Sequence, residues 1–138
     1  MYRYLELADF LIIAGAVLDL DPEVLAKATD LHLAESALMA PSAEFGGIEF
    51  YPDFDTKVAV LGWHLIRNHS LPDGNKRAGL QAMIEFVERN GRTWNYPQED
   101  ENEDVEETVA IIEGVAAGNV SVNELRIWVR EHLGSEPE

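Results

Sequence analysis

Cysteine is absent from this 138-residue chain, so disulfide bonds and thiolate metal sites are excluded. A reducing, cytoplasmic setting is the simplest expectation for such a chain. Basic residues are scarce: ten Lys and Arg stand against 26 Asp and Glu, for a formal net charge of −16. A charge of this sign repels phosphate backbones, so we expect no direct binding to nucleic acid. The composition suits a salt-adapted protein or an ordinary acidic one about equally.

Long hydrophobic runs are also missing. The most apolar stretch, LADFLIIAGAVL at residues 7–18, is too short to span a bilayer, and Asp9 interrupts it. No basic region precedes it, as a signal peptide would require, so we expect a buried helix and no membrane contact. The length and the 46% apolar content suit one compact domain over residues 1–138, with a real core.

Helical patterns dominate the chain. Asp21 is a good N-cap, Pro22 suits the first helical position, and apolar residues then recur at helical spacing until Pro41. The last helix is expected to open with a capping box, Ser121 with Glu124. We expect helices over residues 22–40, 55–68, 75–90 and 122–134. Their expected buried positions are Val58, Leu61, Trp63 and Leu65 in the second, Leu80, Met83, Ile84 and Val87 in the third, and Leu125, Trp128 and Val129 in the last.

Three segments break the helical rhythm. Residues 41–54 carry prolines near both ends and the Gly46-Gly47 pair, which predicts a loop or small hairpin. RTWNY, at residues 92–96, could be a short strand. Residues 99–107 hold seven carboxylates in nine positions. We expect this acidic segment to lie on the surface and to lead into or begin a helix; metal binding is the less favoured interpretation.

The stretch NHSLPDGNKRAG, residues 68–79, concentrates the positive charge that is scarce elsewhere. Gly74 permits a tight turn before a helix whose first amides are unpaired and favour an anion. Lys76 and Arg77 in that first turn are unfavourable beside the positive end of the helix dipole. A bound phosphate would reverse this penalty, so the pattern favours an anion site. An ordinary Asp-Gly-Asn turn is the alternative on spacing alone.

The same loop carries groups suited to chemistry on an anion. Asp73 can hold Mg²⁺, which usually takes one or two protein carboxylates together with phosphate oxygens. A neutral histidine such as His69 can accept a proton from an attacking hydroxyl. Most histidines at helix ends are capping or surface residues, and we expect this of His32 and His64. The chain contains no P-loop motif, no H-E-x-x-H and no adjacent His-Asp pair.

HSLPDGNKRAG resembles the signature of the Fic/Doc superfamily, whose pattern is H-x-F-x-[DE]-G-N-G-R-x-x-R. It is most similar to the Doc (death-on-curing) branch, H-x-F-x-[DN]-x-N-K-R. The flanking segments KVAVLGWHLIRNH and FVERNG also resemble the family, and the resemblance covers roughly residues 24–133. It implies a mainly α fold, a compact Fic/Doc-type helical bundle with a short extended flap or hairpin.

The resemblance also implies a role for each residue of the loop. His69 would be the general base that activates a hydroxyl of the target, and Asp73 would coordinate Mg²⁺ on the phosphates of ATP. Asn75 would contact phosphate, and the two following cations would neutralise its charge. The implied phosphate and nucleotide site comprises Gly74, Asn75, Lys76 and Arg77. The implied flap, which lines up the target's main chain by strand addition, lies at about residues 44–54 and includes Gly46, Gly47, Ile48, Glu49, Phe50 and Tyr51.

Two departures from the superfamily pattern bear on the reaction. Leu71 replaces the usual Phe that anchors the loop in the core, a tolerable aliphatic change. Leu80 stands where the AMP-transferring branch has its second arginine, and Lys76 replaces that branch's glycine. Both fit the Doc branch, in which the nucleotide is thought to bind in reverse and present its γ-phosphate.

This branch implies a toxin, a protein kinase acting on translation elongation factor Tu. Its usual partner is a small antitoxin whose disordered tail caps the site. The alternatives are an AMP transferase and a catalytically silent nucleotide-binding or interaction domain. Intact His69 and Asp73 argue against the silent domain.

Overall fold

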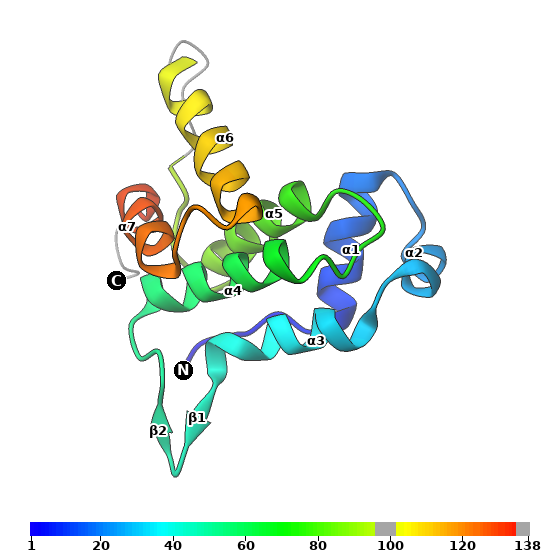
Figure 1. The fold of residues 1–138 in the computed structure, drawn as a ribbon. Helices are drawn as coiled ribbons and strands as arrows, with labels where there is room; N and C mark the ends of the chain where they lie inside the picture. Colours follow the sequence, from blue (N-terminus) through cyan, green and yellow to red (C-terminus); the bar gives the residue numbers. More distant parts are fainter. Residues whose placement is uncertain (96–101, 135–138) are drawn as a thin grey trace.

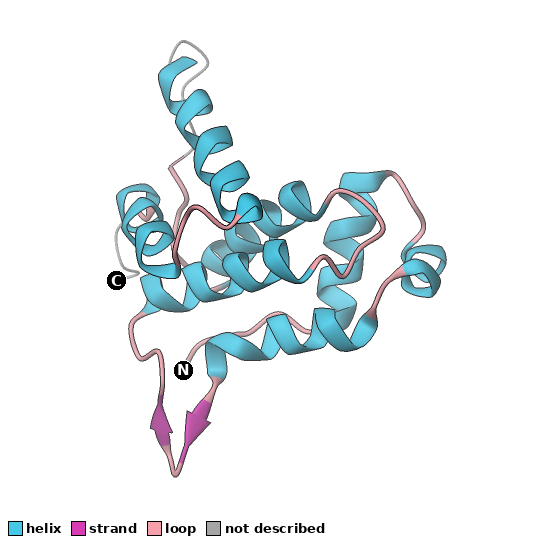
Figure 2. Ribbon diagram, in the orientation of Figure 1, coloured by secondary structure: helices cyan, strands magenta, loops and turns pink. Residues whose placement is uncertain are grey.

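The computed structural model describes residues 1–95 and 102–134 (Figure 1). Within these ranges the elements that the loops connect are helices and one small antiparallel hairpin, as Figure 2 shows. The helices are α1 (Leu7–Leu18), α2 (Pro22–Ala28), α3 (Leu31–Met39), α4 (Phe54–Asn68), α5 (Asn75–Arg89), α6 (Asn102–Ala117) and α7 (Val122–His132), with a 3₁₀ turn at Ala40–Ser42. The hairpin strands are β1 (Glu44–Phe45) and β2 (Ile48–Glu49). The predicted mainly α class with a short hairpin is confirmed.

Helix α4 forms the centre of the fold, and α3, α5, α6 and α7 all pack against it (Figure 1). Two glycines allow α4 and α5 to approach closely. A Cβ atom on Gly62 would collide with Met83, and one on Gly79 would lie 2.6 Å from Cγ1 of Ile66. The side chains predicted to be buried on these helices are buried, except that Trp63 and Leu80 are only half-buried. The α4–α5 pair is therefore a rigid support for the loop between them.

The segment after Asp21 forms two helices, so the prediction of one continuous helix up to Pro41 is wrong. Thr29 is extended, with ψ of 140°, and its hydroxyl donates to the carbonyl of Leu25. Asp30 then caps α3 by accepting a hydrogen bond from the amide of Leu33. Aspartate competes with the helical backbone in this way and favours caps over helix interiors. After this break, the start of α3 lies against the loop that follows α4, where the amide of Asp30 donates to the carbonyl of Ser70.

Helix α1 is only partly buried. Phe10 and Ala14 enter the core, whereas Ile12 is 61% exposed, which corrects the expectation of a buried helix. Among the described residues, no helix combines the length and the apolar character needed to cross a bilayer.

The C-terminal half contains helices α6 and α7. Part of the acidic segment, residues 99–101, lies outside the described residues. The remainder begins α6, and its Glu106 and Glu107 are exposed as expected. In the described part of the predicted strand, residues 92–95, the structure has one antiparallel bridge, between Trp94 and Leu133, and Tyr96 lies outside the described residues. The predicted capping box at Ser121 is present.

The hairpin projects from the body where α4 begins (Figure 1). Glu44 pairs with Glu49, and Phe45 pairs with Ile48. Directly paired residues share one face of a hairpin, so the two glutamates lie on one face and the two apolar side chains on the other. Phe45 and Ile48 are 79% and 73% exposed.

A buried lysine ties this hairpin to the helices. The Lys57 side chain is 0% exposed, and its ammonium donates to the carbonyl of Pro41 and to Oε1 of Glu49, each at 3.1 Å. It also lies over the rings of Tyr2 and Tyr4, 5.8 and 5.5 Å from their centroids. Burial acts to lower the pKa of Lys57, but interactions with Tyr4 and Glu49 outweigh burial and raise it. The ammonium of Lys57 in α4 thus contacts three other segments: the N-terminal segment, the 3₁₀ turn and the hairpin.

Replacing this lysine should destabilise the fold. Lys57→Met keeps an apolar stem but leaves the buried Pro41 carbonyl without its donor. We expect the free energy of unfolding to fall by about 1–3 kcal/mol, measured by urea denaturation. Lys27→Met, at an exposed position of α2, should stay within about 0.5 kcal/mol of the wild type. Equal losses in the two variants would contradict this role for Lys57.

Candidate active site

The loop between α4 and α5 begins and ends with left-handed residues. His69 caps α4 with φ of 48° and ψ of 47°, a conformation uncommon outside glycine. Gly74 precedes α5 with φ of 71°. A Cβ atom there would also lie 2.6 Å from Cδ2 of Leu18, so both the backbone conformation and the close approach favour glycine. The loop consequently lies beside the end of α1 (Figure 1).

Hydrogen bonds hold the loop backbone from two sides. The side chain of Asn75 accepts from the amide of Leu71 at 3.0 Å and donates to its carbonyl at 3.1 Å. Leu71 itself is buried in the core, as its predicted anchoring role requires. On the other side, the amide of Asp30 donates to the carbonyl of Ser70 at 2.8 Å. The loop is therefore preorganised by its own side chains and by the start of α3.

The start of α5 has an inverted charge pattern. Helices α2, α3 and α7 begin with Asp21, Asp30 and Ser121, whose side chains accept hydrogen bonds from helix amides. Helix α5 has no such side-chain cap and no acidic residue in its first turn. Instead, that turn presents Lys76 and Arg77, both exposed. Open amides, the positive end of the helix dipole and two cations together make this position electrostatically favourable for an anion.

The predicted site residues lie in this loop and in the first turn of α5. His69 and Asp73 are exposed at either end of residues 69–73, while Gly74 and Asn75 are half-buried. The side chain of Asn75 is engaged with Leu71, so its backbone amide is the group better placed to meet a phosphate. The contact between Asn75 and phosphate stays a prediction.

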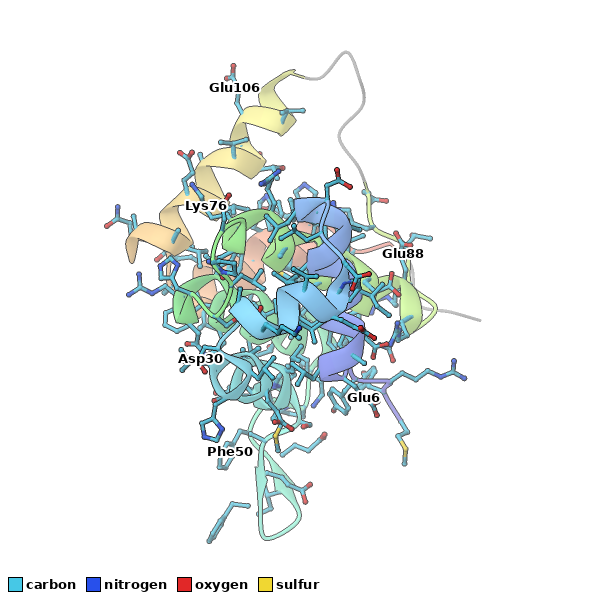
Figure 3. All side chains as sticks on the ribbon, turned by 90° about the vertical axis from the view of Figure 1, so that its right-hand side faces the viewer. Glu6, Asp30, Phe50, Lys76, Glu88 and Glu106 are labelled. Atoms are coloured by element: carbon cyan, nitrogen blue, oxygen red, sulfur yellow. The ribbon has the colours of Figure 1, made fainter. Side chains whose placement is uncertain are left out.

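The predicted flap lies elsewhere. Helix α4 separates the hairpin from His69, and its 15 residues span about 22 Å. Figure 3 shows Phe50 near the end of the molecule that carries the hairpin, and Lys76 well above it, on the side toward Glu106. Gly46 and Gly47 form the exposed turn with φ of 61° and 81°. The role of this hairpin in positioning a target stays a prediction.

A cavity that the sequence did not reveal adjoins the two cations. It has a volume of about 330 Å³ and lies between α5 and α6. Its lining residues are Lys76, Arg77, Leu80, Thr108, Val109, Ile112 and Glu113. Two cations and one carboxylate share this lining with aliphatic side chains, a mixture that suits a ligand with both charged and less polar parts. The only signal in the sequence is the spacing of Val109 and Ile112, one helical turn apart.

The loop also fits a magnesium ion held mainly by a nucleotide. The described residues contain no group of three or more His, Asp or Glu side chains that could hold a metal. Mg²⁺ commonly takes one or two protein carboxylates and completes its octahedron with phosphate oxygens and water. The exposed carboxylate of Asp73, two residues before α5, can supply such a ligand.

The other histidines differ from His69. His32 is exposed on α3, as expected. His64 is half-buried inside α4, with its ring 5.2 Å from that of Trp63, so the expectation of a surface or capping residue is wrong for it. Burial lowers the pKa of His64. His64 lies within α4 and is not part of the loop that carries the candidate site.

Comparison with known proteins identifies the class. Residues 4–87 match the sequence model of the Fic/DOC family, and the chain belongs to this family. A curated relative named Toxin Doc, from Mycolicibacterium smegmatis, is 40% identical over 65 residues. The match covers 47% of this chain and 50% of that protein, so the chain spans about half the length of the relative. The resemblance to the Doc branch is thereby confirmed.

The clamp formed by Asn75 can be tested directly. Asn75→Ala removes both hydrogen bonds to Leu71, so we expect faster hydrogen exchange at the Leu71 amide. The free energy of unfolding should fall by about 1–3 kcal/mol. Gln81→Ala, on an exposed position of the same helix, should change neither quantity appreciably. Unchanged exchange at Leu71 in Asn75→Ala would show that the loop is held by other contacts.

Proposed function

We propose that this chain is a Doc-type toxin, a kinase that transfers the γ-phosphate of ATP to a hydroxyl of a translation elongation factor of the Tu type. The observation that supports it most is the uncapped start of α5. There an acidic protein has Lys76 and Arg77 in the first turn of α5, after the short loop that begins at the exposed His69. The relative named Toxin Doc supports the assignment as a toxin.

The residues of the loop divide the work of phosphoryl transfer. His69 takes the proton from the attacking hydroxyl as the new P–O bond forms and the bond to ADP breaks. The open amides of α5, with Lys76 and Arg77, bind and neutralise the phosphate oxygens. Asp73 would hold Mg²⁺, which when bound neutralises further phosphate charge. Because Asn75 and Leu71 fix the loop, little reorganisation is needed when the nucleotide binds.

The identity of the transferred group depends on Lys76 and Leu80. Lys76 replaces the glycine of the AMP-transferring branch and places an ammonium where that branch leaves room for phosphates. Leu80 gives the α5–α6 cavity an aliphatic wall and offers no guanidinium for a γ-phosphate. Both residues support the reversed nucleotide, with its γ-phosphate beside His69 and its nucleoside pointing outward.

The partners follow from the same proposal. The exposed loop is open to a protein substrate and to the disordered tail of a small antitoxin that would cap it. The flap at residues 44–54 would position the substrate's main chain at the far end of α4 from His69, with Phe45 and Ile48 as exposed apolar contacts. The reaction would take place in the cytoplasm, where the elongation factor is found.

Isotope labelling distinguishes the two transfers. Incubation of the enzyme with purified elongation factor Tu, Mg²⁺ and γ-labelled ATP should label the factor, and α-labelled ATP should not. His69→Ala should reduce the rate by about 10²-fold or more, because no base remains. His32→Ala, an exposed histidine on α3, is the matched control and should keep wild-type activity. Transfer of the α label by the wild type would replace the kinase with the AMP transferase.

A further inference from the structure

A second concentration of positive charge lies at the other end of α4, away from residues 69–77, here called the motif loop. Three of the seven arginines, Arg92, Arg126 and Arg130, line one cavity of about 570 Å³. The start of α4 and the ring of Tyr2 complete its wall. Residues far apart in the sequence therefore bring three of the chain's ten basic side chains together.

Two of these arginines are neighbours on one helix. Arg126 and Arg130 are four residues apart on α7, a spacing at which like charges repel. Arg126 is partly neutralised by Oδ2 of Asp55 at 3.4 Å. Arg130 is exposed and forms no recorded hydrogen bond or ion pair with the residues that the structure describes. Its position in the last turn of α7 favours a cation, but its charge remains free to meet a ligand.

Arg92 approaches the same cavity from the segment after α5. Its Nε and Nη2 atoms donate to the carbonyl of Gly134 at 3.2 and 2.9 Å, which fixes the plane of the guanidinium. That plane lies over the ring of Phe54, 5.6 Å from its centroid. Its Nη1 is left without a recorded partner among the described residues. An arginine held in this way can bind an anion at little cost in side-chain entropy.

Two aspartates in the cavity set the balance of charge. Asp55 is engaged with Arg126 and with the amide of Thr56. Asp53 precedes α4 and makes no capping hydrogen bond with its side chain. Three arginines and two aspartates leave one positive charge in a chain whose total is −16. The net charge of the cavity lining is therefore positive, whereas the net charge of the whole chain is negative.

We propose that the cavity, here called the arginine pocket, binds a phosphate or carboxylate group. Arginine guanidinium groups match both oxyanions through paired N–H donors. Arg130 and the remaining donors of Arg92 and Arg126 are the contacts, and Asp53 opposes them. The proposal stands apart from the kinase assignment, because the arginine pocket lies one helix length from His69.

Titration of the full chain with sodium phosphate tests this at constant ionic strength, balanced with chloride. The readout is the NMR signals of the arginine Nε–H groups. We expect saturable shifts at Arg92, Arg126 and Arg130 that persist in Lys76→Gln, which removes a cation from the motif loop. Arg130→Gln should weaken binding about tenfold, because a charge-assisted contact is lost. Lys27→Gln makes the same change in net charge on α2 and should leave the affinity unchanged.

A second variant should have the opposite effect on the affinity for phosphate. Asp53→Asn should tighten phosphate binding, since it removes the opposing charge without touching an arginine. Parallel titrations with acetate and with a phosphoserine peptide distinguish a carboxylate from a phosphate, and a free anion from one carried by a protein. Shifts that increase linearly without saturation for all three probes would overturn the proposal. So would equal affinities in wild type and Arg130→Gln.

Discussion

The candidate site residues are positioned by the tight loop that joins two closely packed helices, α4 and α5. Gly62 and Gly79 let α4 and α5 approach, and Asn75 closes the connection by bonding both backbone groups of Leu71. With Leu71 buried, the loop backbone has few alternatives. The position of His69 and the direction of the first α5 amides both follow from this clamp.

Electrostatics then determines what the clamped loop can hold. Helices α2, α3 and α7 follow the usual rule and place a side-chain oxygen beside the open amides, through Asp21, Asp30 and Ser121. Helix α5 does the reverse with Lys76 and Arg77. Such an arrangement is unfavourable in the empty protein and becomes favourable only when an anion arrives. A functional site that departs from the local rules of stability is a common pattern in enzymes.

The features that could be predicted are those encoded within a few residues. The motif loop, the hairpin at Gly46-Gly47 and the capping box at Ser121 each depend on neighbours in sequence. The helix break at Asp30 was also encoded locally, but the apolar repeat on both sides concealed it. The α5–α6 cavity and the arginine pocket could not be predicted, since they require contacts between residues such as Arg92 and Arg130 that only the fold creates. The distance between the hairpin and His69 likewise depends on the length and direction of α4.

The central claim is that positive charge at the start of α5 serves an anion and not the stability of the fold. It is tested most directly by the thermal unfolding of wild type and Lys76→Gln, each with and without Mg²⁺ and ATP. Without nucleotide, the variant should melt at the same temperature as the wild type or higher. Nucleotide at 100 times its Kd should stabilise the wild type by about 2.7 kcal/mol and the variant by much less. A variant that is less stable when empty, yet gains as much from ATP as the wild type, would contradict the account.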